Sequence, residues 1–209
     1  MKLLEALSWR YAVKRMNNEK VPQEQVNKIL EAIRLSPSAY GLQPYTIFLI
    51  EEEDLKVKIR KAALDQPQIT ECSHLLVFAA LDDVTEKHVH DYLNFVAEER
   101  NISIDKLDKL KHHIIKFVES RSSKEKYEWA IRQTYLTLGT AIVAAALENV
   151  DSIPIEGFLP DEVDKILNLR EQGLKSAALL ALGYRDEKND HLAKAKKVRR
   201  PMEKLVRWI

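Results

Sequence analysis

Glycine is scarce in this 209-residue sequence, which has only five. Gly41, Gly139, Gly157, Gly173 and Gly183 do not have the spacing of a G-x-G-x-x-G or a P-loop motif. In both motifs glycine lets backbone N–H groups approach a phosphate closely. If the chain binds a nucleotide, side chains must therefore hold most of the phosphate.

Cysteine, net charge and long apolar runs are also lacking. Cys72 is the only cysteine, which excludes a disulfide within the chain and argues against a cysteine-based zinc site. The formal net charge is +1, whereas nucleic-acid binders usually carry a basic face. No apolar run approaches the ~20 residues of a membrane helix, and no apolar segment of a signal peptide follows Met1. We therefore expect a cytoplasmic protein that binds neither nucleic acid nor membrane.

Hydrophobic periodicity and turn residues predict an α+β fold in one domain, residues 1–209. The predicted segments follow from helical or alternating spacing and from turn residues such as Pro22 and Pro37. Helices are expected at 2–8, 22–36, 52–64, 86–100, 105–120, 122–149 and 160–167, and strands at 45–51, 74–81, 152–158 and 175–184.

The predicted helix at 122–149 changes character along its length. Its first half is amphipathic, but Leu136 to Leu147 is apolar nearly all round, which indicates full burial. Two interpretations remain open at this point. The helix lies either at a subunit interface or in the centre of its own core.

Basic residues gather at the two ends of the chain. Residues 184–209 carry nine lysines and arginines and four acidic residues, so the tail has a formal charge of +5 and residues 1–183 have −4. Arg10, Lys14, Lys197 and Arg199 could together form an anion site, since the guanidinium group fits phosphate oxygens in bidentate fashion. The alternative is a solvated run of charge.

Other candidate sites are better explained structurally. Cys72 and His74 share one face of a strand, but no acid that would orient the histidine is identifiable, so a buried structural thiol is favoured. His88 and His90, or the adjacent His112 and His113, do not have a metal-ligand spacing on a helix. Solvated helix surface is the favoured interpretation there, and no metal is expected.

Five segments in fixed order together carry a family resemblance. They are Arg10-x-x-x-Lys14, Ser36–Pro44 (SPSAYGLQP), Trp129-x-x-x-Gln133-x-Tyr135-Leu136, Pro154–Phe158 (PIEGF) and Lys197-x-Arg199-Arg200-Pro201. With these, residues 3 to 201 resemble the FMN-dependent nitroreductase family. The similarity is greatest to its oxygen-insensitive NAD(P)H nitroreductases and dihydropteridine reductases.

The resemblance implies a nitroreductase-like α+β fold with a central mixed or antiparallel sheet. It implies a homodimer with FMN in two sites at the interface, and the long helix packed at the dimer axis. Residues 86–120 would form lid helices over a channel, and residues 200–209 would extend over the partner subunit. The apolar tip Val206-Arg207-Trp208-Ile209 would then have a place to be buried.

The resemblance also implies roles for individual residues. Arg10, Lys197 and Arg199 would bind the FMN phosphate, and Lys14 would lie near flavin N1, where a cation stabilises the charge of the reduced flavin. The backbone N–H of Glu156 would meet flavin N5. The second subunit would contribute Pro37, Ser38 and Gln133. The full set of expected cofactor contacts is Arg10, Tyr11, Ala12, Lys14, Pro37, Ser38, Ala39, Gly41, Asp65, Gln68, Gln133, Leu136, Pro154, Ile155, Glu156, Gly157, Lys197 and Arg199.

The sequence departs from the family pattern at five of these positions. Ala12, Ala39 and Gly41 stand where relatives carry Ser, Ser and Asn, and Asp65 and Gln68 stand where some relatives carry Asn and Lys. Because Gln68 has no charge and Asp65 opposes a flavin anion, we expect a lower flavin potential than in relatives with the lysine.

The expected activity is hydride transfer from NAD(P)H through flavin N5 to a nitroaromatic, quinone or related acceptor, by a ping-pong mechanism. No side chain need act as an acid or base, because the cofactor carries the chemistry. Two alternatives remain open: a flavoenzyme of the same fold with different chemistry, such as dehalogenation or flavin destruction, or a non-catalytic flavin-binding or helical scaffold protein.

Overall fold

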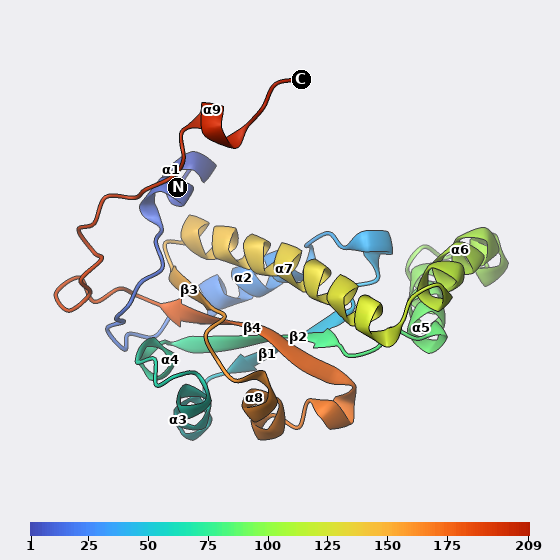
Figure 1. Ribbon diagram of the computed structural model, residues 1–209, viewed down its shortest axis with the longest axis horizontal. Coiled ribbons are helices and arrows are strands. Elements are labelled where there is room, and N and C mark those ends of the chain that lie inside the picture. Colours follow the sequence, from blue (N-terminus) through green and yellow to red (C-terminus); the bar gives the residue numbers. More distant parts are fainter.

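A four-stranded antiparallel sheet lies at the centre of the computed structural model, which describes residues 1–209 (Figure 1). The strands are β1 (Tyr45–Ile50), β2 (His74–Leu81), β3 (Asp151–Ile155) and β4 (Leu174–Gly183), in the order β1-β2-β4-β3. β2 is buried almost throughout, because both of its faces are covered. Full coverage explains why its sequence is apolar without alternation.

Helices cover both faces of this sheet (Figure 1). On one face lie α2 and α7, and on the other lie α3, α4 and α8. The helices are α1 (Leu3–Trp9), α2 (Gln23–Arg34), α3 (Glu53–Ala62), α4 (Gln68–Glu71), α5 (Glu86–Glu99), α6 (Asp108–Glu119), α7 (Ser123–Leu147), α8 (Pro160–Ile166) and α9 (Met202–Leu205), with the 3-10 turns η1 (Ala39–Gly41), η2 (Ile104–Leu107) and η3 (Arg170–Gln172). The predicted α+β fold is confirmed, and the sheet is antiparallel. The short elements α4, η1, η2, η3 and α9 were not predicted.

The helix α7, with 25 residues, is the longest helix of the molecule. A capping box fixes its start, because Ser122 accepts from the backbone N–H of Glu125 and the Glu125 carboxylate bonds back to the Ser122 N–H. By length and composition alone α7 could cross a membrane, yet here it packs across all four strands and α2.

In a single chain the segment from Leu136 to Leu147 is not fully buried, and its burial in an assembly stays a prediction. Tyr135 is 37% exposed and Leu136 is 52% exposed, while Leu138 and Ala141 on the other side of α7 are buried against the sheet. One face of α7 therefore packs against its own sheet, and a second, partly apolar face is exposed.

The tail that follows β4 runs beside the segment that follows α1. Met16 and Arg185 form a β-bridge, the Asn17 N–H donates to the Tyr184 carbonyl, and the Asp186 N–H donates to the Arg15 carbonyl. Beyond this contact α9 and the last residues extend away from the body (Figure 1). Trp208 is 93% exposed there. The two ends of the chain are thus brought side by side.

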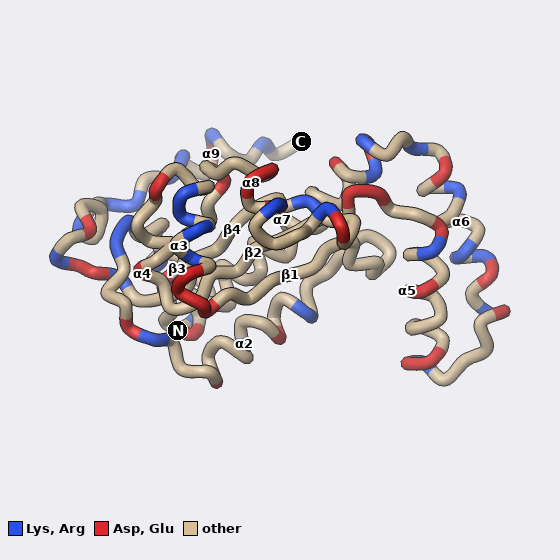
Figure 2. The backbone as a smooth tube through the Cα atoms, turned by 90° about the horizontal axis from the view of Figure 1, so that it is seen from below, with Lys and Arg blue, Asp and Glu red and all other residues tan.

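The helices α5 and α6 pack against each other at the end of the molecule away from α1 (Figure 1). Both helices carry acidic and basic residues (Figure 2), as the charged amphipathic sequence predicted. Their apolar faces form a separate core cluster with Leu42 and Trp129. The assignment of residues 86–120 as a lid stays a prediction.

Candidate cofactor site

The four predicted anion-site cations line one cavity. Arg10 and Lys14 come from the segment after α1, and Lys197 and Arg199 come from the tail. The cavity has a volume of about 520 Å³. Its other lining residues are Ser8, Trp9, Tyr11, Ala12, Arg185, Leu192, Ala193, Ala195, Lys196 and Val198.

Arg10 carries a nitrogen with no partner in this cavity. Its Nε is buried and makes no hydrogen bond, and burial together with the neighbouring Arg199 lowers the pKa of the guanidinium. A buried donor without an acceptor is costly, and repulsion between two cations adds to that cost. An anion bound between the two guanidinium groups would remove both penalties, so the cavity fits a phosphate group.

Lys197 adds a third positive charge at a fixed place. Its Nζ donates to the carbonyls of Leu7 and Arg10 at the end of α1. Burial and the charges of Arg10 and Arg199 lower the pKa of Lys197. These two carbonyls hold the ammonium group close to Arg10. The repulsion among Arg10, Lys197 and Arg199 indicates that a negative charge bound in the cavity would be stabilised.

The turn at Glu156 and Gly157 directly follows β3, and the Gln66 side chain holds it by a hydrogen bond. Gln66 Nε2 donates to the Gly157 carbonyl at 2.8 Å and to the Ala63 carbonyl at 3.0 Å. The Phe158 N–H donates back to the Glu156 carbonyl, which makes the turn tight. Glu156 and Gly157 are exposed, so their backbone groups are accessible to a ligand.

Gly157 is not required by crowding or by backbone angle. A side chain there would make only ordinary contacts with Gln66 and Leu64, at 3.6 Å and 3.7 Å. Ile155 is buried in the core beneath the turn, and Pro154 is half-buried. The expected contacts of these residues with a cofactor stay predictions.

Two predicted contacts, Asp65 and Gln68, already have partners in the protein. The Asp65 carboxylate pairs with Arg60 Nε at 2.8 Å, so part of its charge is compensated. Gln68 is buried, and its Nε2 donates to Gln66 Oε1 at 2.9 Å. Gln68 therefore has its side-chain oxygen and one N–H left for a ligand. It supports Gln66, which in turn supports Gly157.

A second group of predicted residues lies around η1. The Ala39 N–H donates to Gln133 Oε1 at 2.8 Å, and the Gln43 N–H donates to Ser38 Oγ at 2.9 Å. Gly41 has a φ of +75°, and a Cβ there would lie 2.6 Å from Tyr92 Oη. Gly41 is thus needed both for the left-handed conformation and for space.

The expected contacts do not all line one cavity: six of them line the cation cavity, and Gly41 lines another. Pro37, Ser38, Ala39 and Gly41 belong to the segment around η1, which Gln133 of α7 holds from behind. A cavity of about 530 Å³ lies beside Gly41, and it shares no residue with the cation cavity. Arg10 and Lys14 follow α1, which lies at the end of the molecule away from α5 (Figure 1), whereas the cavity beside Gly41 is lined by Tyr92 and Phe95 of α5. One chain therefore does not bring the whole predicted set together around one ligand.

Sequence similarity identifies the family. The pattern described as "Nitroreductase family" matches residues 7–184. The chain belongs to the nitroreductase family. The resemblance expected from the five segments is confirmed.

Relatives of similar length share nearly the whole nitroreductase chain. A Staphylococcus saprophyticus protein provisionally named NAD(P)H nitroreductase is 31% identical over 217 residues, covering 99% of this chain and 96% of the relative. A Bacillus subtilis protein, YfkO, with the same provisional name is 30% identical over 223 residues, covering 99% and 97%.

Solved nitroreductase structures share the fold. YdfN from Bacillus subtilis, provisionally called a nitroreductase, has a TM-score of 0.88 at 20% identity, over 100% of this chain and 99% of that one. A protein from Exiguobacterium sibiricum with the same provisional description was solved in complex with FMN. It has a TM-score of 0.83 at 20% identity, over 100% of this chain and 98% of that one.

The candidate site contains residues that the sequence did not single out. The Arg185 guanidinium lies 4.3 Å from the ring centre of Trp9 and 4.7 Å from that of Tyr11, and it forms an ion pair with Asp151 at 2.6 Å. Asp190 is buried and bonds to Tyr11 and Lys14, which line the cavity. No motif marked Arg185 or Asp190, because Asp151, Tyr11 and Lys14 lie more than 30 positions away from them in the sequence.

The two candidates set aside on sequence grounds lie outside both cavities. Cys72 is buried and free, and burial raises the pKa of its thiol to about 12. His74 is buried between Ser73 Oγ at 2.8 Å and Glu51 Oε1 at 2.9 Å. Glu51 is an acid partner that the sequence did not reveal, but the thiol that would serve as nucleophile donates to Ile69 instead.

One histidine of α5 and one of α6 make local hydrogen bonds. His88 caps the start of α5 by bonding to Thr85, and His112 bonds to the Asp108 carbonyl one turn earlier in α6. No group of three histidine, cysteine or acidic side chains is arranged to hold a metal ion.

Proposed function

We propose that the protein is a cytoplasmic, homodimeric FMN-dependent oxidoreductase that takes reducing equivalents from NAD(P)H and passes them to a nitroaromatic, quinone or related acceptor. The observation that carries the proposal is the cation cavity, where the orphaned Arg10 Nε and the mutual repulsion of Arg10, Lys197 and Arg199 call for an anion. Family membership and the FMN found in the Exiguobacterium relative support the choice of that anion.

The chain's own residues bind and orient the cofactor in this proposal. Arg10, Lys197 and Arg199 hold the phosphate, and Lys14 at the same cavity supplies a positive charge for the flavin. The turn at Glu156 and Gly157 offers backbone groups to the ring edge. When bound, FMN would supply hydride transfer between NAD(P)H and the acceptor, with the two substrates binding in turn.

A second subunit completes the site. Pro37, Ser38 and Gln133 do not reach the cation cavity of their own chain, and the exposed face of α7 at Tyr135 and Leu136 offers a packing surface. A symmetric dimer that pairs these faces would bring the η1 segment of one chain to the cation cavity of the other.

Purification with added FMN tests the proposal. We expect a yellow protein whose flavin absorbance is bleached by NADH or NADPH without oxygen, and recovers when a quinone or nitroaromatic is added. A colourless protein that does not bind FMN would contradict the flavin assignment. Bound FMN that no reduced nicotinamide bleaches would favour the flavin-binding alternative, and turnover of a halogenated substrate or of FMN itself would favour the other.

A further inference from the structure

Asp190 is a buried carboxylate that bonds to three residues lining the cation cavity, Tyr11, Lys14 and Leu192. It is 4% exposed, and it is the only acidic residue among the tail positions 188–199. From its charge alone, this carboxylate would be expected to weaken phosphate binding, because like charges repel. Its contacts point to the opposite effect.

The carboxylate joins the two segments that supply the phosphate-binding cations. Asp190 Oδ2 accepts from the Lys14 N–H at 2.7 Å and from the Tyr11 hydroxyl at 3.1 Å. Asp190 Oδ1 accepts from the Leu192 N–H at 2.8 Å. One side chain thus fixes the segment that carries Arg10 and Lys14 to the tail that carries Lys197 and Arg199.

These bonds also hold the negative charge in place. Donation from backbone N–H groups and from Tyr11 outweighs burial, so the pKa of Asp190 lies below its usual value. The same contact and burial raise the pKa of Tyr11. Both oxygens are therefore occupied by donors, and the carboxylate is ionised at neutral pH.

We propose that Asp190 is a positioning residue for the phosphate of the cofactor. It sets the distance between the cations of the first segment and those of the tail, although it does not touch the phosphate itself. The role rests on the proposed function, because it assumes that the anion in the cavity is the phosphate of FMN.

The comparison of FMN with riboflavin isolates this role. The two flavins differ only in the phosphate, so the ratio of their affinities reports the phosphate site alone. Binding can be followed through flavin fluorescence in the purified full-length protein freed of cofactor. For Asp190→Asn we expect FMN affinity to fall about 10- to 100-fold, the range for losing charged hydrogen bonds, while riboflavin affinity stays within about threefold.

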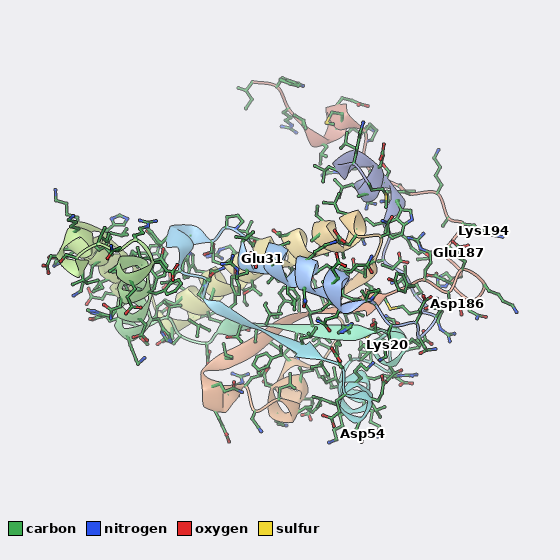
Figure 3. The ribbon with its side chains drawn as sticks, turned by 180° about the vertical axis from the view of Figure 1, so that it is seen from behind. Lys20, Glu31, Asp54, Asp186, Glu187 and Lys194 are labelled. Carbon is green, nitrogen blue, oxygen red and sulfur yellow. The ribbon has the colours of Figure 1, made fainter.

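Tyr11→Phe is the milder second variant, and Asp186→Asn is the matched control. Tyr11→Phe removes one of the three bonds and should lower the affinity ratio less than Asp190→Asn. Asp186 lies on the outer loop of the tail beside Glu187 (Figure 3), and its carboxylate bonds only to Lys188 and Asn189 of its own turn. Its substitution makes the same charge change and should leave the ratio unaltered.

The possible outcomes separate the two proposals. An Asp190→Asn variant whose preference for FMN is unchanged or increased overturns the role of Asp190 alone. Equal loss of FMN and riboflavin in both Asp190→Asn and Tyr11→Phe also overturns it, because that pattern indicates general unfolding. A wild-type protein that binds FMN no better than riboflavin overturns the phosphate site, and with it both proposals.

Discussion

The side-chain amide of Gln66 holds the backbone carbonyl of Gly157 at 2.8 Å, and Gln68 holds Gln66 in turn. This relay links α4, a short helix that the sequence did not predict, to the turn expected to face the flavin. Its consequence is that the orientation of the Gly157 carbonyl, directly after Glu156, depends on a side chain 91 positions earlier. Removing the relay should affect the turn more than the rest of the fold.

Gln66→Met should loosen this turn while keeping the volume of the side chain. We expect a loss of stability of about 1–2 kcal/mol and a slower reduction of bound FMN by NAD(P)H, with FMN affinity within about threefold of wild type. Rapid-mixing absorbance measures the reduction rate. Gln172→Met is the control, because Gln172 Nε2 likewise donates to two backbone carbonyls, of Leu167 and Asn168, away from the turn. Equal reduction rates in both variants would exclude a positioning role for Gln66.

Replacing the phosphate-binding cations should abolish cofactor retention. The double variant Arg10→Ala, Arg199→Ala removes the two guanidinium groups whose repulsion marks the anion site, and we expect FMN to be lost during purification. The control is Lys188→Ala with Lys194→Ala, which removes two exposed charges of the tail and should retain FMN; Lys194 is labelled in Figure 3. Full occupancy in the arginine double variant would place the phosphate elsewhere.

Gly41→Ala should destabilise the protein by about 1–3 kcal/mol, since it combines a left-handed backbone with a clash against Tyr92 Oη. Gly173→Ala separates these causes, because Gly173 has a φ of +68° but open space around it. Gly173→Ala should lower the free energy of unfolding by less than Gly41→Ala. The hydroxyl of Tyr92 is the atom in the way, so adding Tyr92→Phe to Gly41→Ala should cost less than the two single changes summed. Additive chemical-denaturation energies would contradict the clash.

Leu136→Glu should separate the subunits of the proposed dimer, because it puts a charge on the exposed apolar face of α7. We expect monomers in sedimentation experiments and a weakened FMN site. Val57→Glu is the matched control, since Val57 is 44% exposed on α3, which covers the other face of the sheet. A Leu136→Glu protein that sediments as wild type would remove α7 from the interface.

Acidification should destabilise the fold through His74. Burial lowers the pKa of His74, and the nearby Glu51 offsets this only in part. His74 therefore binds a proton more readily in the unfolded chain than in the folded one. The stability contributed by neutral His74 is present above the unfolded pKa of about 6.5, and it declines as the pH falls below that value. His74→Gln should flatten stability between about pH 7 and pH 5 in thermal denaturation, while His112→Gln on the exposed face of α6 should not. Identical slopes in both variants would contradict the assignment.

Most of the fold could be predicted from the sequence because its main elements have strong periodicity. The buried strand β2 was predicted with the bounds that the structure has, and α7 to within two residues. The short helix α4 was missed, because four residues after a proline show no period. The exposure of Leu136 was also missed, since an apolar sequence does not reveal whether its own chain or another covers it.

The candidate site could be predicted only where charge or a motif marked it. Arg10, Lys14, Lys197 and Arg199 were expected together and line one cavity. Asp190 and Gln66 were not expected, because each acts through backbone groups of residues far away in the sequence. Such contacts depend on the folded path of the chain rather than on any local pattern.

Helix α7 connects two loops that the proposed dimer assigns to different flavins. Gln133 holds the Ala39 backbone on one side, while on another side burial and the neighbouring Glu156 carboxylate raise the pKa of Tyr135 to about 12. These residues are two positions apart on a rigid rod. A shift of the Glu156 turn when FMN binds one site would therefore displace the Ala39 loop, which serves the other site. The two centres of a dimer built in this way would not turn over independently.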